Sequence, residues 1–339
     1  MIALSRSSSD KAPRVAIVGG GLVGLWSAIE LRRKGAGVDV YDAGHMAGRA
    51  SWAGGGILCP LWPWDYSDRI TTLSLRGAQL WRDELSDAGC EGQAGLLKSG
   101  MRVLDQHAPA EQWGHRSGMD VRAQADGSVL LPDVWQVRTP RAARAVADIA
   151  VSKGVHIYPE HAAQVELRGD HATLQISEGR LPEYDHVVVC AGAWAAAVLG
   201  DLADIIDVEP VRGQMIAFAA PPGEFHEITL GGGAYVIPRS DGLVLCGSTM
   251  EYVGFDSSTT EAGRVALQQL AVRIQPTLTN YPVVEHWAGL RPGSSTGEPR
   301  IGQLSDNLWI NAGHHRNGVA MAPAAAAELA QAMSGVLTS

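Results

Sequence analysis

The stretch RVAIVGGGLVGLWSAIELRRKGAGVDVYD, from Arg14 to Asp42, decides the expected fold. It begins with a short apolar, β-branched run, Arg14–Val18, which is typical of a buried parallel strand. Glycines follow at once, then apolar residues at helical spacing over residues 22–34, then a second apolar run, Val38–Tyr41, that ends at Asp42. This order over about thirty residues predicts a βαβ unit.

The glycines after the first strand form a motif of their own. Gly19-Gly20-Gly21-Leu22-Val23-Gly24 fits the pattern GxGxxG, and Asp42 lies 18 residues after Gly24. Such glycines let backbone N–H groups and the N-terminus of the helix approach a pyrophosphate. Asp42 would then accept hydrogen bonds from ribose hydroxyls. The pattern predicts a dinucleotide site; the alternative is a tight turn with a surface Asp.

A second glycine-rich segment, RASWAGGGI, runs from Arg49 to Ile57. Three successive glycines allow the main chain to lie against a flat ring or a phosphate. The alternative is a flexible linker, but linkers rarely lie between a tryptophan such as Trp52 and the apolar Ile57-Leu58.

Apolar periodicity and turn residues predict the remaining elements. We expect helices over residues 71–88, from Thr139-Pro140 onward, and over 260–274 and 319–333, with Thr139 as a cap. We expect strands within 155–176, at 186–190 and within 211–245, with turns at Gly169-Asp170 and Asp241-Gly242.

Charge and composition limit the function classes. The 339 residues carry a net charge of −9, which disfavours binding to nucleic acid or to an anionic membrane surface. Four separated cysteines without a CxxC pair favour a reducing compartment. Residues 1–13 are polar and Ser-rich and read as a disordered leader, and no stretch approaches 18 apolar residues. We therefore expect a cytoplasmic protein.

Four further motifs complete the pattern. They are Ala191-Gly192-Ala193-Trp194, Val211-Arg212-Gly213-Gln214-Met215, WAGLRPG ending at Gly293 and GHHRNG over residues 313–318. With the two glycine segments, and in this order, they make the chain resemble glycine oxidase, of the D-amino-acid oxidase group of FAD-dependent amine oxidoreductases. The resemblance spans residues 14 to about 333.

The resemblance implies an α/β, two-domain flavoprotein. A Rossmann-type FAD-binding domain would comprise residues 14–80, 140–205 and 285–335, and a substrate domain built on a mixed or antiparallel sheet would comprise 81–139 and 206–284. FAD would be bound non-covalently, oxygen would be the electron acceptor, and the protein would be a homo-oligomer.

The glycine patterns and the resemblance together indicate the cofactor contacts. These are Gly19, Gly21, Leu22, Val23, Gly24, Asp42, Ala43, Arg49, Ala50, Ser51, Gly55, Gly56, Ile57, Gln164, Ala191, Gly192, His314, His315, Arg316, Asn317, Gly318, Val319 and Ala320.

The substrate contacts follow from the same resemblance. Arg291 matches the arginine that binds the substrate carboxylate, Tyr235 matches the tyrosine that closes this site, and Arg316 lies at its edge. A planar guanidinium suits this task because it donates two parallel hydrogen bonds to a carboxylate. The alternatives are an ion pair of Arg291 with a protein carboxylate and a half-buried strand position for Tyr235.

The implied reaction is oxidative deamination of glycine or a small N-substituted glycine, giving glyoxylate, ammonia or an amine, and hydrogen peroxide. No side-chain base is required, because the substrate amine needs only to be neutral. The alternatives are an oxidase for a larger N-carboxymethyl secondary amine, an FAD dehydrogenase with another acceptor, and a flavin-binding protein without turnover.

Three residues raise separate questions. His314 and His315 are adjacent, so their rings diverge and no third ligand lies nearby, and we expect no metal site. Cys59 is expected to be an inert thiol rather than a covalent flavin attachment. His315 and Ala320 replace the larger Tyr or Phe and Leu of the resembling family, which favours a substrate with a larger substituent than glycine.

Overall fold

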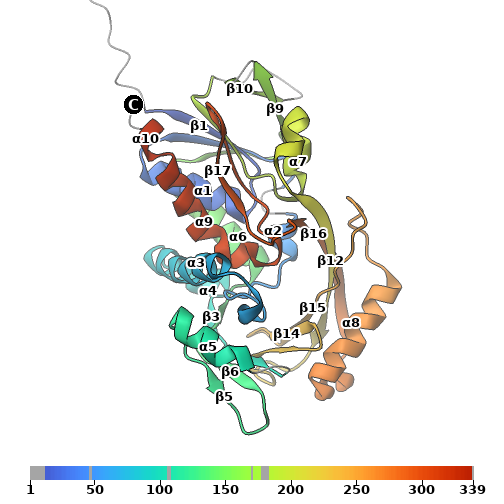
Figure 1. Ribbon diagram of the computed structural model, residues 1–339. Helices are drawn as coiled ribbons and strands as arrows, with labels where there is room; N and C mark the ends of the chain where they lie inside the picture. The colour runs from blue at the N-terminus through green and yellow to red at the C-terminus, as the bar shows by residue number, and fades with distance from the viewer. Residues whose placement is uncertain (1–11, 46–47, 105–107, 169–170, 177–182, 338–339) are drawn as a thin grey trace, which may run out of the picture.

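The computed structural model describes residues 12–45, 48–104, 108–168, 171–176 and 183–337. Two β-sheets with helices on their faces organise this part of the chain (Figure 1). The expected leader falls mainly, and the expected turn at Gly169-Asp170 wholly, outside the described residues.

The first sheet contains the predicted βαβ unit. Strands β1 (Arg14–Val18) and β2 (Gly37–Tyr41) pair in parallel, and α1 (Leu22–Arg33) connects them, so this prediction is confirmed. Among the described residues the sheet has six strands in the order β17-β18-β11-β1-β2-β8. The added strands are β8 (His156–Tyr158), β11 (His186–Val189), β17 (Arg300–Ser305) and β18 (Leu308–Ala312). All neighbours are parallel except β17 and β18.

Alternation along β1 assigns its side chains to two layers. Val15 and Ile17 pack into a core to which α1, α3 (Asp68–Asp87), α6 (Thr139–Ser152) and α9 (Gly318–Ala332) contribute. Ala16 and Val18 face the opposite layer, which holds α7 (Ala195–Leu199) and the hairpin of β9 (Ala163–Arg168) and β10 (His171–Ile176) (Figure 1). Both faces of the sheet are therefore covered, which explains the continuous apolar run of the strand.

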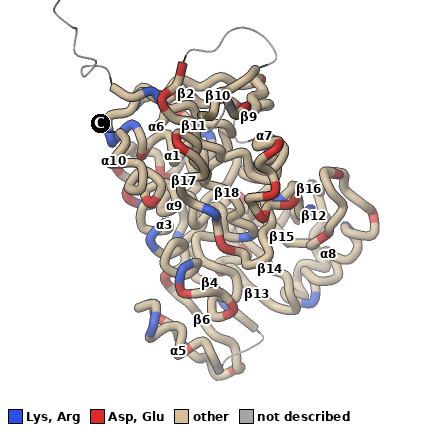
Figure 2. The backbone as a smooth tube through the Cα atoms, turned by 45° about the horizontal axis from the view of Figure 1, so that its top comes forward, with Lys and Arg blue, Asp and Glu red and all other residues tan. Residues whose placement is uncertain are grey.

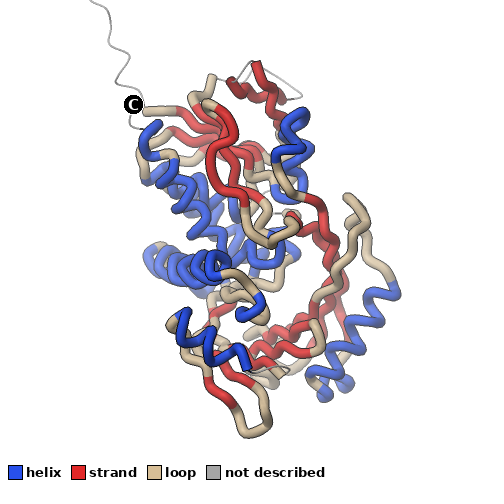
Figure 3. Tube along the Cα trace, viewed as in Figure 1, coloured by secondary structure: helices blue, strands red, loops and turns tan. Residues whose placement is uncertain are grey.

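The second sheet is mixed. Within the described ranges it has eight strands in the order β16-β12-β15-β14-β13-β4-β6-β5. Their bounds are β4 (Met101–Val103), β5 (Arg122–Ala123), β6 (Val129–Leu131), β12 (Glu209–Ala219), β13 (Ile228–Gly231), β14 (Ala234–Pro238), β15 (Leu243–Gly247) and β16 (Val283–Gly293). Neighbours are antiparallel except β13 and β4. Figure 3 shows the strands of both sheets in red and the helices in blue. The predicted Asp241-Gly242 turn joins β14 and β15.

Strand β16 bears on the domain boundaries. It pairs with β12 along most of its length, whereas the boundaries expected from the sequence assign residues 285–335 to the FAD-binding domain. We therefore propose that the boundary lies after Gly293, and the domain division stays a proposal.

Further helices, 3-10 turns and one two-stranded ribbon complete the described structure. The helices are α2 (Ala50–Ala53), α3 (Asp68–Asp87), α4 (Glu91–Ala94), α5 (Ala108–Ser117), α8 (Glu261–Ile274) and α10 (Ser334–Leu337). The 3-10 turns are η1 (Pro63–Asp65), η2 (Gly192–Trp194), η3 (Gly200–Ile205), η4 (Pro276–Asn280) and η5 (His315–Asn317), and β3 (Leu97–Lys98) pairs with β7 (Trp135–Gln136).

Side-chain caps determine where two helices begin. Ser67 accepts a hydrogen bond from the backbone of Ile70, so α3 begins three residues earlier than its apolar pattern predicts. Thr260 caps α8 in the same way. The predicted cap at Thr139 is wrong. Its hydroxyl donates to the carbonyl of Gly54 at 2.6 Å and so fixes the second glycine segment instead.

Charges are spread over the molecule. In Figure 2, the positions of Lys and Arg and those of Asp and Glu are scattered along the backbone. None of the helices in the described ranges has the length and apolar character that a membrane span requires.

Candidate active site

A cavity of about 370 Å³ lies where the two sheets meet. Its wall includes the segments that follow β1, β2 and β11, namely residues 19–23, 42–43 and 190–194. The opposite wall comes from β12, β14 and β16 of the second sheet. The cavity thus opens at the carboxyl ends of parallel strands, where ligands bind in α/β proteins.

The first glycine motif leaves a helix N-terminus open toward this cavity. Gly19 has φ of 112°, and a Cβ there would lie 2.4 Å from the carbonyl oxygen of Cys190. A Cβ on Gly24 would lie 1.8 Å from the carbonyl oxygen of Gly19, so only glycine lets α1 start this close to the loop. The N–H of Leu22 donates to the hydroxyl of Ser51 at 2.9 Å, but the N-cap Gly21 has no side chain and the first turn of α1 has no acidic residue, so the remaining N–H groups of this turn suit an anion.

Asp42 organises the adjoining loops. One carboxylate oxygen accepts from the backbone N–H of Gly20 at 2.7 Å and the other from that of Gly44 at 2.8 Å. Asp42 also lines the cavity, as do Ala43 and Gln164 of β9. An ionised carboxylate has about four acceptor sites, so two remain for a ligand hydroxyl.

The second glycine segment is held from behind by a buried arginine. Arg239 donates to the carbonyl oxygens of Gly55 at 2.8 Å and Val137 at 3.0 Å, and to the side chain of Gln136. It forms no ion pair among the described residues, and burial lowers its pKa to about 9. Gly56 has φ of 75°, and a Cβ there would lie 2.0 Å from the carbonyl oxygen of Val137. The segment is therefore a fixed wall of the cavity and not a flexible linker.

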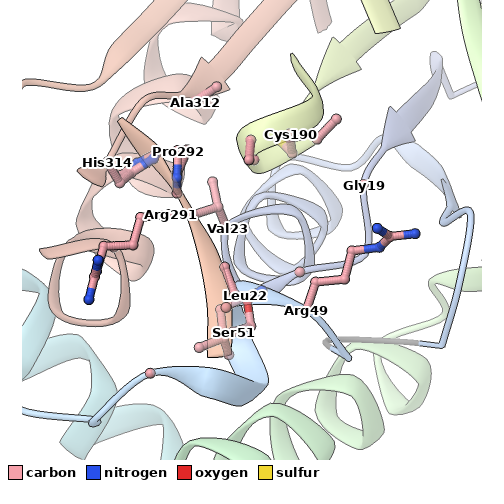
Figure 4. A pocket seen from close by; sticks show the side chains of 18 of the residues that line it. Gly19, Leu22, Val23, Arg49, Ser51, Cys190, Arg291, Pro292, Ala312 and His314 are labelled. Atoms are coloured by element: carbon pink, nitrogen blue, oxygen red, sulfur yellow. Dashed lines mark hydrogen bonds between the residues drawn. The ribbon is translucent and has the colours of Figure 1, made fainter. Parts of the chain in front are cut away.

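Arg291 lies on β16 at the other end of the cavity (Figure 4). Its Nη2 donates to the hydroxyl of Ser248 at 2.6 Å, and its Nη1 donates to the carbonyl of Thr249 at 3.2 Å. A Cβ on Gly213 of β12 would lie 2.0 Å from Nη2, so a side chain at this position would displace the guanidinium from where it crosses the neighbouring strand. Within the described residues Arg291 forms no ion pair, which argues against the alternative that it pairs with a protein carboxylate.

Three groups surround this guanidinium. Tyr235 of β14 is buried, and its phenol raises the pKa of Arg291 while burial and the charge of Arg316 lower it, burial having the larger effect. Burial, Arg291 and Arg316 together lower the pKa of His315 to about 4. His315 is therefore neutral at physiological pH, and Arg291 remains charged because an arginine starts from a pKa above 12.

Several buried polar atoms along the cavity have no partner in the described structure. They are Oδ1 of Asn311, Nε2 of His314 and Nε2 of His315. Buried polar atoms are normally hydrogen-bonded, so these atoms point to a ligand with its own donors and acceptors. Together with the open helix N-terminus and the glycine walls, they fit FAD. The pyrophosphate would lie at α1 and the flavin ring between residues 55–57 and residues 314–319.

Comparison with known proteins agrees with this geometry. Residues 14–332 match the family described as FAD dependent oxidoreductase (DAO). The chain belongs to this family. It is 34% identical to a glycine oxidase of Pseudomonas aeruginosa over 95% of each chain. The solved structure of glycine oxidase from Geobacillus kaustophilus is 25% identical in sequence and has a TM-score of 0.83. The match covers 94% of this chain and 95% of that structure. The iminodiacetate oxidase of Chelativorans sp. BNC1 is 26% identical, also with a TM-score of 0.83, over 95% of each chain.

This DAO-family protein is thus an FAD-dependent oxidoreductase of the kind that oxidises amino acids and amines, and the predicted fold class and cofactor are confirmed. Most predicted site residues line the one cavity described above. Gly24, Asn317 and Ala320 do not line it. A Cβ on Gly77 of α3 would lie 2.0 Å from the carbonyl oxygen of Ala320, so the backbone of Ala320 packs closely against α3.

Sequence reasoning missed four side chains at this flavoenzyme's cavity. Arg239 holds the second glycine segment, and Ser248 holds the guanidinium of Arg291. Asn311 carries a side-chain oxygen without a partner in the described structure. Trp194 stacks against Arg49, with 4.1 Å between the guanidinium carbon and the ring centroid. One signal was available for Arg239, a charged residue directly after the apolar strand Ala234–Pro238. Ser248 had no such signal, because its contact depends on a residue far along the chain.

Burial keeps Cys59 and His314 uncharged at physiological pH. Cys59 lines the cavity, and burial raises its thiol pKa to about 12, so it is neutral and a poor nucleophile at physiological pH. Burial lowers the pKa of His314 to about 3. No group of three or more potential metal ligands occurs in the described parts of the chain.

Proposed function

We propose that this protein catalyses the FAD-dependent oxidative deamination of glycine or a small N-substituted glycine. The products are glyoxylate, ammonia or an amine, and hydrogen peroxide. The observation that carries the proposal is Arg291, a half-buried guanidinium in the cavity wall that forms no ion pair within the described residues. A carboxylate substrate would supply the missing negative charge. The relatives named glycine oxidase and iminodiacetate oxidase support the same substrate class.

Each residue of this end would have a separate task. Arg291, held by Ser248 and Thr249, would bind the substrate carboxylate with two N–H donors and so fix the direction of the Cα–H bond. The phenol of Tyr235 would donate to the same carboxylate. His315 stays neutral and adds no positive charge, so the substrate amine can bind as a free base.

FAD, when bound, accepts the hydride from Cα and returns the two electrons to oxygen. The protein's contribution is to orient the substrate and to exclude water from the cavity. Those walls are largely apolar or glycine, for example Ile57, Leu61 and Met215. We also propose that FAD is bound non-covalently, because burial keeps the thiol of Cys59 neutral and no charged group of the described residues lowers its pKa. Acid precipitation should release FAD into the supernatant, and colour left in the pellet would refute non-covalent binding.

The reaction is tested with the purified, FAD-loaded protein in air. Peroxide formation is measured with glycine, sarcosine, N-ethylglycine and D-alanine. The proposal expects peroxide and glyoxylate from at least one of the glycines. Flavin reduction without peroxide would indicate a dehydrogenase, and no flavin reduction with any of them would refute the proposed reaction.

A further inference from the structure

A second arginine lies at the same end of the cavity as Arg291. Arg316 belongs to η5, is half-buried and lines the cavity. Its guanidinium carbon lies 5.9 Å from the ring centroid of Trp62, and it forms no ion pair among the residues that the structure describes. Trp62 belongs to the segment after the second glycine loop, so Arg316 is oriented by an aromatic face and not by a protein carboxylate.

The charges that line the cavity are unevenly distributed. Asp42 is the single acidic side chain among the described lining residues, and it lies beside the first glycine motif. Arg291 and Arg316 therefore share their end of the cavity without a counter-charge. Both act on His315, which lies next to Arg316 in sequence and is uncharged, and the charge of Arg316 also lowers the pKa of Arg291.

A substrate with one carboxylate would neutralise one of these two cations. Bringing that substrate into the cavity would also displace water from the second cation, which is unfavourable unless a new partner replaces the water. A second carboxylate on the same substrate would be such a partner. Because Arg291 and Arg316 come from different elements, β16 and η5, they can bind two groups at separate points of one molecule.

We infer that the physiological substrate is a secondary amine with two carboxylates, in which Arg291 binds the carboxylate of the glycine unit that is oxidised and Arg316 binds a carboxylate on the N-substituent. The smallest member of this class is iminodiacetate. The inference rests on the proposed function and adds the substrate class. It assigns the side chain of Arg316 to recognition of the substituent.

The reaction of this substrate consumes one water and one dioxygen. The Cα of one carboxymethyl group loses a hydride to FAD and the nitrogen loses a proton, so a C=N bond forms. Water adds to this carbon and the C–N bond breaks, giving glyoxylate and a primary amine, which for iminodiacetate is glycine. The two electrons pass through FAD to dioxygen, and hydrogen peroxide forms.

The test compares two substrates of equal shape. N-Isobutylglycine has the branched outline of iminodiacetate but a neutral substituent. In the FAD-loaded protein, kcat/KM for iminodiacetate should exceed that for N-isobutylglycine by at least about tenfold, the factor expected from one charge-assisted contact. Arg316→Met should remove most of this ratio. Arg144→Met is the control and should preserve the ratio, because Arg144 is exposed on α6 and is not among the described residues that line the cavity.

A binding measurement gives a second readout. Diglycolate, the ether analogue of iminodiacetate, has no amine to oxidise, and its dissociation constant follows from the change in flavin absorbance. Arg316→Met should weaken diglycolate by at least about tenfold and leave isobutoxyacetate within about twofold. Equal loss for both ligands, or equal loss of kcat/KM for both substrates, would show that Arg316 acts on the flavin or on folding, and would overturn the inference.

Glycine and sarcosine, assayed in parallel, separate the two proposals. Peroxide from sarcosine without a preference for iminodiacetate over N-isobutylglycine would overturn the dicarboxylate inference and leave the proposed function intact. No flavin reduction with any of the four amines would overturn both.

Discussion

The two ends of the cavity are built in different ways. The end around Gly19 and Asp42 depends mainly on the βαβ segment of residues 14–42, and it presents backbone N–H groups, the N-terminus of α1 and one carboxylate. The end around Arg291 combines β12, β14, β16 and η5, which are far apart in sequence, and it presents two guanidinium groups and no carboxylate among the described residues. The first end depends on close main-chain approach, and the second depends on side chains that can be exchanged. Substitutions at the two ends should therefore fail differently, in cofactor binding at one and in substrate binding at the other.

The largest effect is expected from Gly24→Ala. The added Cβ would lie 1.8 Å from the carbonyl oxygen of Gly19, so α1 and the loop must separate. We expect a loss of about 3 kcal/mol or more in the free energy of unfolding and loss of most bound FAD. Gly92→Ala is the control, because its Cβ would meet no atom within 4 Å. Equal melting temperatures and FAD contents in the two variants would contradict this account.

Asp42→Ala should affect the same end less severely. It removes the acceptor for Gly20 and Gly44 and, by our account, for the ribose hydroxyls. FAD affinity should fall by roughly 1.5–3 kcal/mol, measured by titration of the apoprotein. Asp42→Asn keeps one acceptor oxygen, so its FAD affinity should lie between that of the wild type and that of Asp42→Ala. In the FAD-loaded fraction, KM for substrate should be normal. A raised KM would mean that the two ends are not independent.

Ser248→Ala should affect the substrate end alone. Its hydroxyl accepts from Nη2 of Arg291 at 2.6 Å and orients the guanidinium. Loss of this hydrogen bond should raise KM by about fivefold, equivalent to ~1 kcal/mol, with normal FAD content and a smaller change in kcat. Ser152→Ala, remote from the cavity lining, removes a comparable hydroxyl, which donates to the carbonyl of Ile149, and should leave KM unchanged. A KM equal to that of Ser152→Ala would remove Ser248 from the positioning of Arg291.

The smallest effect concerns pH. Burial lowers the pKa of His315 to about 4, below its value in the unfolded chain, so the unfolded state binds more protons between about pH 6.5 and 4. Stability is therefore lost as the pH falls through this window. His315→Asn tolerates the positive φ of 45° at this position and should reduce the fall in melting temperature between pH 7 and 4.5. His226 is exposed, so His226→Asn is the control and should show the same fall in melting temperature as the wild type. The same fall in His315→Asn would contradict the account.

How far the sequence predicts each end follows from the same contrast. The βαβ unit and Asp42 were predictable because strand, glycines, helix and acid lie within one local pattern. Arg291 was indicated by resemblance, and its partners Ser248 and Gly213 were not predictable, because strand pairing across the second sheet brings them together. Thr139 was predicted as a cap for a local reason and was wrong for a tertiary one, its bond to Gly54. Local motifs thus give the cofactor end, and long-range pairing decides the rest.

The most direct test of the central claim is anaerobic reduction of the flavin by glycine and sarcosine in wild type, Arg291→Met and Arg291→Lys. If Arg291 binds the substrate carboxylate, Arg291→Met should keep its FAD, but the second-order rate constant of flavin reduction should fall. The fall should correspond to a loss of about 2–5 kcal/mol in transition-state stabilisation, as expected when one partner of a charged hydrogen-bonded pair is removed. Arg291→Lys should recover part of this, because an ammonium keeps the charge without the two-pronged geometry. Methylamine, which lacks the carboxylate, should react equally with all three proteins. Wild-type rates with glycine or sarcosine in folded, FAD-loaded Arg291→Met would contradict the account.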